Sequence, residues 1–113
     1  MMLIERLLYE HLCAVQTVPV YMEKPANPPE SFYLVEKTGG DESNQVRYAD
    51  FAIQSYAPSL FQAATLDETL VDYVKSLQED PGVASVHHNS SYNFTNTQTK
   101  EYRYQSVYEV VYY

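Results

Sequence analysis

The sequence predicts an α+β fold in which two helices pack on a mostly antiparallel sheet, in the order α-β-β-β-α-β-β. Two segments place apolar residues three and four positions apart, which is the spacing of a helix with one buried side. Five shorter segments are rich in β-branched and aromatic residues and are separated by turn residues, which predicts strands joined largely as hairpins. A chain of 113 residues is expected to form a single domain, residues 1–113.

The predicted helices are residues 3–15 and 60–78. Leucine and isoleucine form the apolar stripe of the first helix, with Glu5, Arg6 and Glu10 on its other side. Ser59 is a suitable N-cap for the second helix, because its hydroxyl can accept a hydrogen bond from a free backbone N–H. The apolar stripe of this helix is expected at Ala63, Leu66, Leu70, Val74 and Leu77.

The predicted strands are residues 18–23, 32–37, 46–56, 83–94 and 102–113. Pro19 limits the first strand to an edge, because proline cannot donate to a ladder. The second and third strands are expected to form a hairpin closed by a loop over residues 38–44, which contains Gly39 and Gly40. The fourth strand is expected to bulge at residues 89–91, and residues 95–100 to form a hairpin tip.

The last strand is unusually rich in tyrosine. Tyr102, Tyr104, Tyr108 and Tyr112 are evenly spaced, so their rings share one side of an extended segment. Tyrosine combines an apolar ring with a hydroxyl, which suits a surface that is wet part of the time and covered for the rest. Two helices can cover only one side of a sheet, so a surplus of rings is expected to be buried by a neighbouring subunit. These four tyrosines are therefore predicted to contribute to subunit contacts or to the core beneath them.

The charge is acidic and unevenly distributed. Of a net charge of −8, residues 1–82 contribute thirteen Asp/Glu against five Lys/Arg, whereas residues 83–113 hold two of each. Such a chain is poorly suited to bind phosphates, because nucleic-acid affinity comes mainly from basic side chains. An acidic wall can still line a conduit through which DNA passes without being held. The alternative is simply an acidic surface that keeps the protein in solution.

Individual residues with reactive side chains favour structural interpretations. His87 and His88 are neighbours in a predicted strand, so their rings point to opposite sides, which argues against a shared metal ion. His11 is expected to be packed or at an interface. Cys13, the single cysteine, is expected to be a small buried group in a protein of a reducing compartment.

Acidic pairs and serines give no catalytic pattern. The clusters Asp41-Glu42 and Asp67-Glu68, the latter with Asp72, are interpreted as a mobile loop and a solvated helix surface. The two glycines lack the lysine of a phosphate-binding loop, and no serine lies in a nucleophile-elbow pattern. The sequence therefore predicts neither an enzyme nor a cofactor or metal site. No apolar run approaches the roughly 20 residues needed to cross a bilayer, so no membrane association is expected.

The chain contains, in order, the segments MLIERLLYEHL, PVYMEKP, PESFYLVEKTGG, YADFAIQSYA, SLFQAATLDETLVDYVKSL and YRYQSVYEVVYY. In the order, length and character of these segments, the whole chain resembles the small tail-terminator and tail-completion proteins of long-tailed bacteriophages.

This resemblance implies a non-enzymatic protein, usually a hexameric ring, that ends polymerisation of the tail tube and joins the tail to the head connector. Its partners would be further copies of itself, the major tail tube protein and head connector proteins, with DNA passing through the central hole. Its location would be the virion tail or neck, after assembly in the host cytoplasm. By analogy with the loops of the family, Asp41 and Glu42 would face the channel or a stacked ring.

Two alternatives remain open from the sequence. One is a head-closure or connector protein from the neck of the same kind of virion. The other, from a different functional class, is a non-phage adaptor that adds an exposed strand to the sheet of another protein. Ring formation and the identity of the bound partner distinguish the three.

Overall fold

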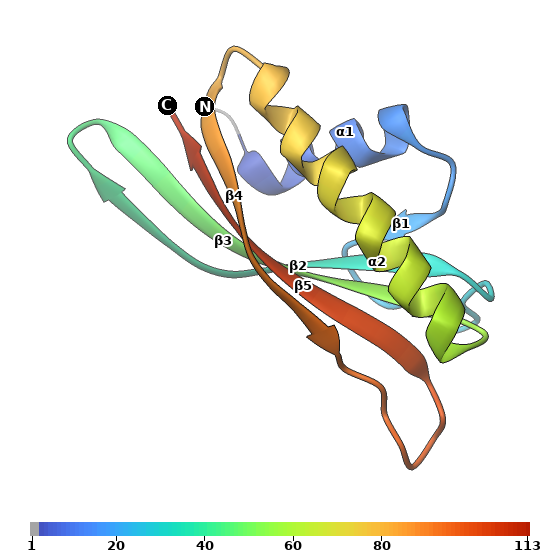
Figure 1. Cartoon of the computed structure of the whole chain (residues 1–113). Coiled ribbons are helices and arrows are strands. Elements are labelled where there is room, and N and C mark those ends of the chain that lie inside the picture. Colours follow the sequence, from blue (N-terminus) through green and yellow to red (C-terminus); the bar gives the residue numbers. More distant parts are fainter. Residues whose placement is uncertain (1–2) are drawn as a thin grey trace.

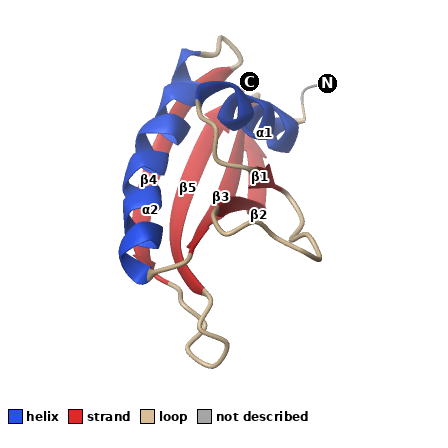
Figure 2. Cartoon of the chain, turned by 90° about the vertical axis from the view of Figure 1, so that its right-hand side faces the viewer, coloured by secondary structure: helices blue, strands red, loops and turns tan. Residues whose placement is uncertain are grey.

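The computed structural model describes residues 3–113 and confirms the predicted α+β order. Its elements are α1 (Ile4–Val15), β1 (Val20–Tyr21), β2 (Phe32–Ser43), β3 (Val46–Ala57), α2 (Leu60–Lys75), a 3₁₀ turn (Ser76–Glu79), β4 (Val83–Asn93) and β5 (Tyr102–Tyr112). The five strands form one sheet in the order β1-β2-β3-β5-β4. Only β1 runs parallel to its neighbour. Both helices lie on the same side of the sheet (Figures 1 and 2).

The main core lies between the helices and the sheet. Ile4, Leu8 and Leu12 of α1 are buried there, together with Leu70 and Val74 of α2. The sheet contributes large side chains to the same core, among them Tyr33, Phe51 and Tyr108. Burial of this apolar surface is the main stabilising term of the fold.

The boundaries of α2 have identifiable causes. The Ser59 hydroxyl accepts a hydrogen bond from the backbone N–H of Gln62 at 3.2 Å, which confirms the predicted N-cap. At the other end the helix tightens into the 3₁₀ turn, and Leu77 of that turn is still buried in the core. The Asp80 side chain then accepts a hydrogen bond from the Gly82 backbone N–H at 2.8 Å, and β4 begins one residue later.

The β2–β3 hairpin is longer than expected. The predicted loop over residues 38–44 is instead the second half of β2, and the chain reverses at Asn44 and Gln45, whose φ angles are +52° and +66°. These left-handed values are those of a two-residue hairpin turn. Gly39 lies just after a shift in register, and a Cβ there would come within 3.2 Å of the Asp50 carboxylate. The glycines therefore permit a close strand approach and do not form a loop.

The first strand is shorter than expected, and the fourth agrees with the prediction. Only Val20 and Tyr21 pair with β2, opposite Tyr33 and Leu34. Pro19 precedes the strand, and its carbonyl accepts the Tyr33 N–H at 2.9 Å. In β4 the register shifts between His88 and Ser90, which confirms the predicted bulge.

Candidate interaction surface on the helix-free face of the sheet

Strand pairing defines which residues lie opposite the helices. Residues directly opposite each other in an antiparallel pair share a side of the sheet. We call the side away from α1 and α2 the helix-free face. Its members are Phe32, Leu34, Glu36 and Asp41 of β2, Tyr48, Asp50, Ala52, Gln54 and Tyr56 of β3, Arg103, Gln105, Val107, Glu109 and Val111 of β5, and Ser85, His87, Ser90 and Tyr92 of β4.

One end of the helix-free face is an aromatic cluster with two cations. Phe32 and Tyr56 are stacked, with ring centroids 4.3 Å apart and planes at 9°, and Tyr21 packs edge-on against Phe32 at 5.7 Å. The Lys24 ammonium and the Arg103 guanidinium lie 5.3 and 5.5 Å from the centre of the Tyr56 ring. Arg103 also donates a hydrogen bond of 2.7 Å to the Tyr56 hydroxyl. The face thus carries a second, smaller core of its own.

A polar chain extends this cluster across the sheet. The Tyr56 hydroxyl donates to Gln54 Oε1 at 3.3 Å, and Gln54 Nε2 donates to Gln105 Oε1 at 2.9 Å. Gln105 Nε2 in turn donates to the Tyr92 hydroxyl on the outermost strand. Side chains of β3, β5 and β4 are therefore connected in one network. Such a network holds its members in fixed positions, so the surface is ordered before anything binds to it.

The aromatic side chains at the β4 end of this network are partly exposed. Tyr92 and Phe94 pack edge to face at 6.1 Å and are 41% and 38% exposed. The Arg103 guanidinium lies 4.6 Å from the Phe94 ring centre and donates to the Phe94 carbonyl at 2.7 Å. Exposed aromatic rings beside an ordered arginine are the composition that protein interfaces favour.

The other end of the helix-free face is acidic. Asp50 of β3 stands directly opposite Glu109 of β5, and Glu36 and Asp41 lie on the same side along β2. None of these four carboxylates takes part in an ion pair within residues 3–113. Like charges directly opposite each other destabilise a sheet. This arrangement therefore costs stability in the isolated subunit.

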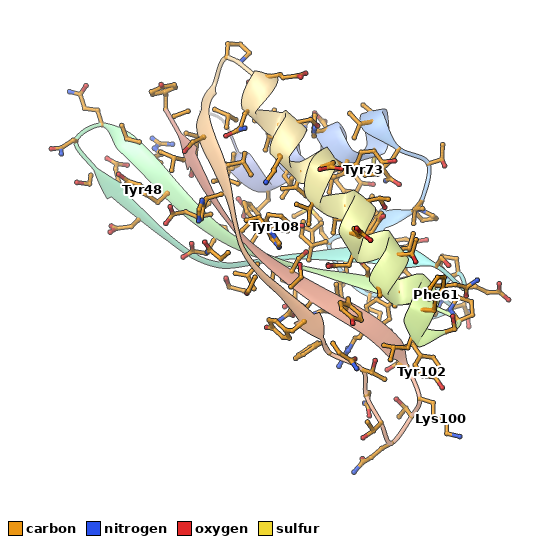
Figure 3. The ribbon with its side chains drawn as sticks, in the orientation of Figure 1. Tyr48, Phe61, Tyr73, Lys100, Tyr102 and Tyr108 are labelled. Atoms are coloured by element: carbon orange, nitrogen blue, oxygen red, sulfur yellow. The ribbon has the colours of Figure 1, made fainter. Side chains whose placement is uncertain are left out.

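The predicted tyrosines divide between core and surface. Their rings share one side of β5, as expected, but it is the side beneath the helices. Tyr108 is fully buried and Tyr112 is 7% exposed, and both belong to the main core. Of the two predicted roles, subunit contact or core, these two side chains have the core role in the described chain. Tyr102 and Tyr104, near the β4–β5 hairpin, are half-buried, and their role in subunit contacts stays a prediction. Figure 3 shows Tyr108 near the middle of the sheet and Tyr102 toward that hairpin.

The predicted channel residues lie in a strand. Asp41 and Glu42 are both exposed near the end of β2, opposite Tyr48 and Arg47. As neighbours in a strand they face opposite sides, and only Asp41 is on the helix-free face. Glu42 pairs with Arg47 at 3.3 Å. Their assignment to a mobile loop is therefore wrong, and a role in a channel or ring contact stays a prediction.

Asp67 is buried, contrary to the expected solvated surface of α2. It is 4% exposed, and its Oδ1 atom has no hydrogen-bond partner among the described residues. The buried positions of α2 are Ala63, Asp67, Leu70 and Val74, a regular alternation of four and three residues, while Leu66 is only half-buried. Burial raises the pKa of the Asp67 carboxyl, and the hydroxyls of Ser91 and Ser106 and the charge of His88 only partly oppose this.

His88 and Ser91 lie near Asp67, which brings together the residue types of a hydrolytic triad. His88 Nε2 is 2.8 Å from the Ser91 hydroxyl. It is also 3.0 Å from the Ser90 carbonyl, which can only accept, so Nε2 carries a proton and donates. A general base needs a free electron pair on the nitrogen that faces the serine. No hydrogen bond joins Asp67 to His88 in residues 3–113. This geometry is that of a structural cluster.

The remaining sequence candidates have structural positions. His11 Nε2 lies 2.7 Å from the Ser76 hydroxyl and 3.0 Å from the Tyr73 carbonyl, so it joins α1 to the end of α2, as a packed histidine does. Cys13 is exposed, which corrects its expected burial, because it lies beside the apolar stripe of α1. His87 is exposed and faces away from His88. Residues 3–113 contain no group of three metal-ligating side chains.

The network around Tyr56 was not predicted from the sequence. Its members, among them Phe32, Arg103 and Tyr92, come from four strands, and no local spacing predicts that they meet. The information that predicts this network is the register of the strands. Once the β3–β5 pairing is known, Gln54 stands opposite Gln105 and Tyr56 opposite Arg103.

Comparison of the sequence with protein-family models and with curated proteins finds no match. None of the helices in residues 3–113 is long and apolar enough to cross a membrane.

Proposed function

We propose that this protein is a structural component of a long-tailed bacteriophage that caps the tail tube. In this proposal the copies assemble as a ring, most simply a hexamer, that ends tube polymerisation and offers a docking surface to the head connector. The proposal rests on the resemblance of the whole chain to tail-completion proteins and on the character of the helix-free face.

The observation that carries the proposal is that the helix-free face is ordered but incompletely covered. Its aromatic end is held in place by Arg103 and the Gln54–Gln105 hydrogen bond, yet Tyr92 and Phe94 remain substantially exposed. A surface that is both preorganised and partly apolar loses little entropy when a protein covers it. This supports a role in assembly with other protein surfaces.

The acidic end fits a second requirement of a tail protein. Asp50 and Glu109 face away from the helices without a neutralising partner in the described chain. A carboxylate surface repels the phosphates of DNA, so DNA can move past it without being retained. Placing like charges opposite each other costs stability. A requirement that DNA pass this surface explains why the charges are present despite that cost.

The direct test is to add the purified protein to the polymerising tail tube protein of the same phage. We expect tubes with a ring at one end and arrested growth, seen by negative-stain electron microscopy. The double variant Tyr92→Ala, Phe94→Ala should cap poorly, whereas Thr97→Ala in the hairpin tip should cap normally. Tubes that grow unchanged, with no ring bound, would refute the proposal.

The alternatives predict other binding partners. A head-closure protein would bind the portal side and leave growing tubes unaffected. A non-phage adaptor would bind a host protein through a free strand edge without forming a ring, and the long outer edge of β4 is the feature that favours it.

A further inference from the structure

The outermost strand β4 has an edge that is open over most of its length. It runs from Val83 to Asn93 and pairs only with β5, so its other side presents backbone N–H and C=O groups that no strand covers. Of these, the Val86 N–H already donates to the Gln78 side chain at 2.9 Å, which leaves the stretch from His87 to Asn93 as the open part of the edge. Monomeric proteins usually protect such an edge with lysine, other charges or proline. The eleven residues of β4 include no Lys, Arg, Asp, Glu or Pro. Its protective features are two irregularities, at Ala84 and Asn89, and the Gln78 side chain that caps the Val86 N–H.

The opposite edge of the sheet is also largely free, and it is acidic. β1 covers only Tyr33 and Leu34, so β2 has no outer partner from Val35 to Ser43 within residues 3–113. This stretch carries Glu36, Asp41 and Glu42. Its one cation, Lys37, lies 3.9 Å from Glu5 of α1.

We propose that β4 of one copy pairs with the free stretch of β2 in the next copy, head to tail. The two edges are similar in length, and β4 has no carboxylate to repel the acidic β2 edge. In a continuous sheet, His87 and Ser90 of β4 would lie on the same side as Glu36 and Asp41 of the neighbour. The inference deepens the proposed ring and rests on it, but the association can be measured without any phage component.

Head-to-tail pairing has a geometric consequence. An interface between two different surfaces leaves one of each free at the ends, so copies add until a ring closes, or continue as an open filament if the rotation between copies does not close. Both helices lie on one side of each sheet (Figure 2). When the sheets close into a ring, the helical layer needs the larger circumference and therefore lies on the outside of the ring. The helix-free face lies on the inside. Asp50 and Glu109 then face the central hole.

Two matched proline variants test the pairing. Asn89 of β4 and Thr38 of β2 are both exposed, and both stand at irregularities where they have no partner on the neighbouring strand. Asn89→Pro is designed to block the β4 edge and Thr38→Pro the β2 edge. Ala26→Pro, in the proline-rich segment before β2, is the control. Circular dichroism and thermal unfolding establish that each variant is folded.

Light scattering after size exclusion then gives the result. We expect the wild type and Ala26→Pro to form a closed oligomer and each edge variant alone to be monomeric. Mixing the two edge variants should give a dimer and nothing larger, because each supplies the edge that the other lacks. Thr38→Pro that still dimerises alone would show β4 pairing with β4 and overturn the proposal. So would a mixture that stays monomeric, or a wild type that stays monomeric at all concentrations.

A charge series provides an independent measurement if a proline variant does not fold. Ser90→Glu should weaken the oligomer by repelling the acidic β2 edge, and Ser90→Lys should preserve or strengthen it. Combining Ser90→Glu with Asp41→Lys should restore assembly. Equal behaviour of the Glu and Lys variants would contradict the proposed partner edge. If the oligomer forms as predicted but tubes are not capped, the pairing stands and the proposed function fails.

Discussion

At the scale of single residues, Asp67 is the most informative side chain. It occupies a core position on α2, with one carboxylate oxygen unpartnered. A carboxyl whose folded-state pKa is raised destabilises the fold when ionised. Below the ordinary pKa of 3.8 the group is protonated in both states and costs nothing; as pH rises through the raised folded-state pKa the penalty develops fully. Stability should therefore fall over that interval.

Replacing this carboxyl with a neutral isostere should remove the penalty. We expect Asp67→Asn to increase the free energy of unfolding at about pH 7 by about 1 kcal/mol, the order of cost for a poorly partnered buried polar group. The gain should vanish near pH 3, where the wild-type carboxyl is protonated. Denaturant unfolding at both pH values measures it, with the exposed Asp72→Asn as control. A loss of stability at neutral pH would show that the charged form of Asp67 has a favourable partner.

The reassignment of the tyrosines gives a second residue-scale prediction. Tyr108 is fully buried, and its hydroxyl accepts a hydrogen bond from Ser106 at 2.8 Å. Tyr108→Ala should lower the free energy of unfolding by about 3–5 kcal/mol, as loss of a large core ring does. Tyr104→Ala, at a half-buried position of the same strand, should cost much less. Similar losses for the two variants in denaturant unfolding would contradict the division between core and surface.

These two residues also show what sequence patterns can and cannot predict. The even spacing of the tyrosines predicted correctly that they share one side of β5. It could not show whether that side lay under the helices, because this depends on how α2 crosses the sheet. On α2, the buried stripe could pass through Leu66 or through the next residue, Asp67. Because Leu66 is apolar, the stripe was predicted to include it, but the buried residue is Asp67. The available signal was the presence of Ser91 and Ser106, two polar residues on the side of the sheet that faces the helices, because they suit a polar residue such as Asp67 on the buried side of α2.

At the scale of elements, the β3–β5 ladder combines strong pairing with an electrostatic penalty. Asp50 and Glu109 stand opposite each other on the helix-free face. We expect Glu109→Gln to raise the free energy of unfolding by about 0.2–1 kcal/mol, the usual size of a cross-strand side-chain effect. The gain should shrink at high salt, because screening weakens the repulsion in the wild type. Urea unfolding at low and high salt measures it, and Glu68→Gln on the exposed side of α2 is the control.

The element boundaries were predictable where a residue has one dominant effect. Ser59 marked the start of α2 because its hydroxyl has an obvious partner in a free N–H. The β2–β3 hairpin was mispredicted because two glycines usually indicate a loop. Here they allow β2 to run close to β3, and the turn is formed by Asn44 and Gln45 in the left-handed region. A glutamine at such a φ is uncommon, so sequence alone favours the glycines.

At the scale of the whole molecule, the distribution of charge over the sheet matters more than the net charge of −8. In the sequence, the excess of negative charge lies in residues 1–82. The structure instead brings Glu109, from the nearly neutral C-terminal part, beside Asp50 on the helix-free face. Strand order, which composition cannot predict, therefore decides where an acidic surface forms.

Charge reversal on that surface tests whether its position has a function. If the helix-free face lines a ring, Asp50→Lys with Glu109→Lys should turn a wall that repels DNA into one that binds it. Binding should fall steeply with salt, because it would come from release of counterions. Glu68→Lys with Asp72→Lys changes the net charge equally but lies on the exposed side of α2. Fluorescence anisotropy with labelled duplex DNA should show binding for the first pair alone. Equal binding by both pairs would show that only net charge matters and would remove the support that the acidic end gives to a DNA conduit.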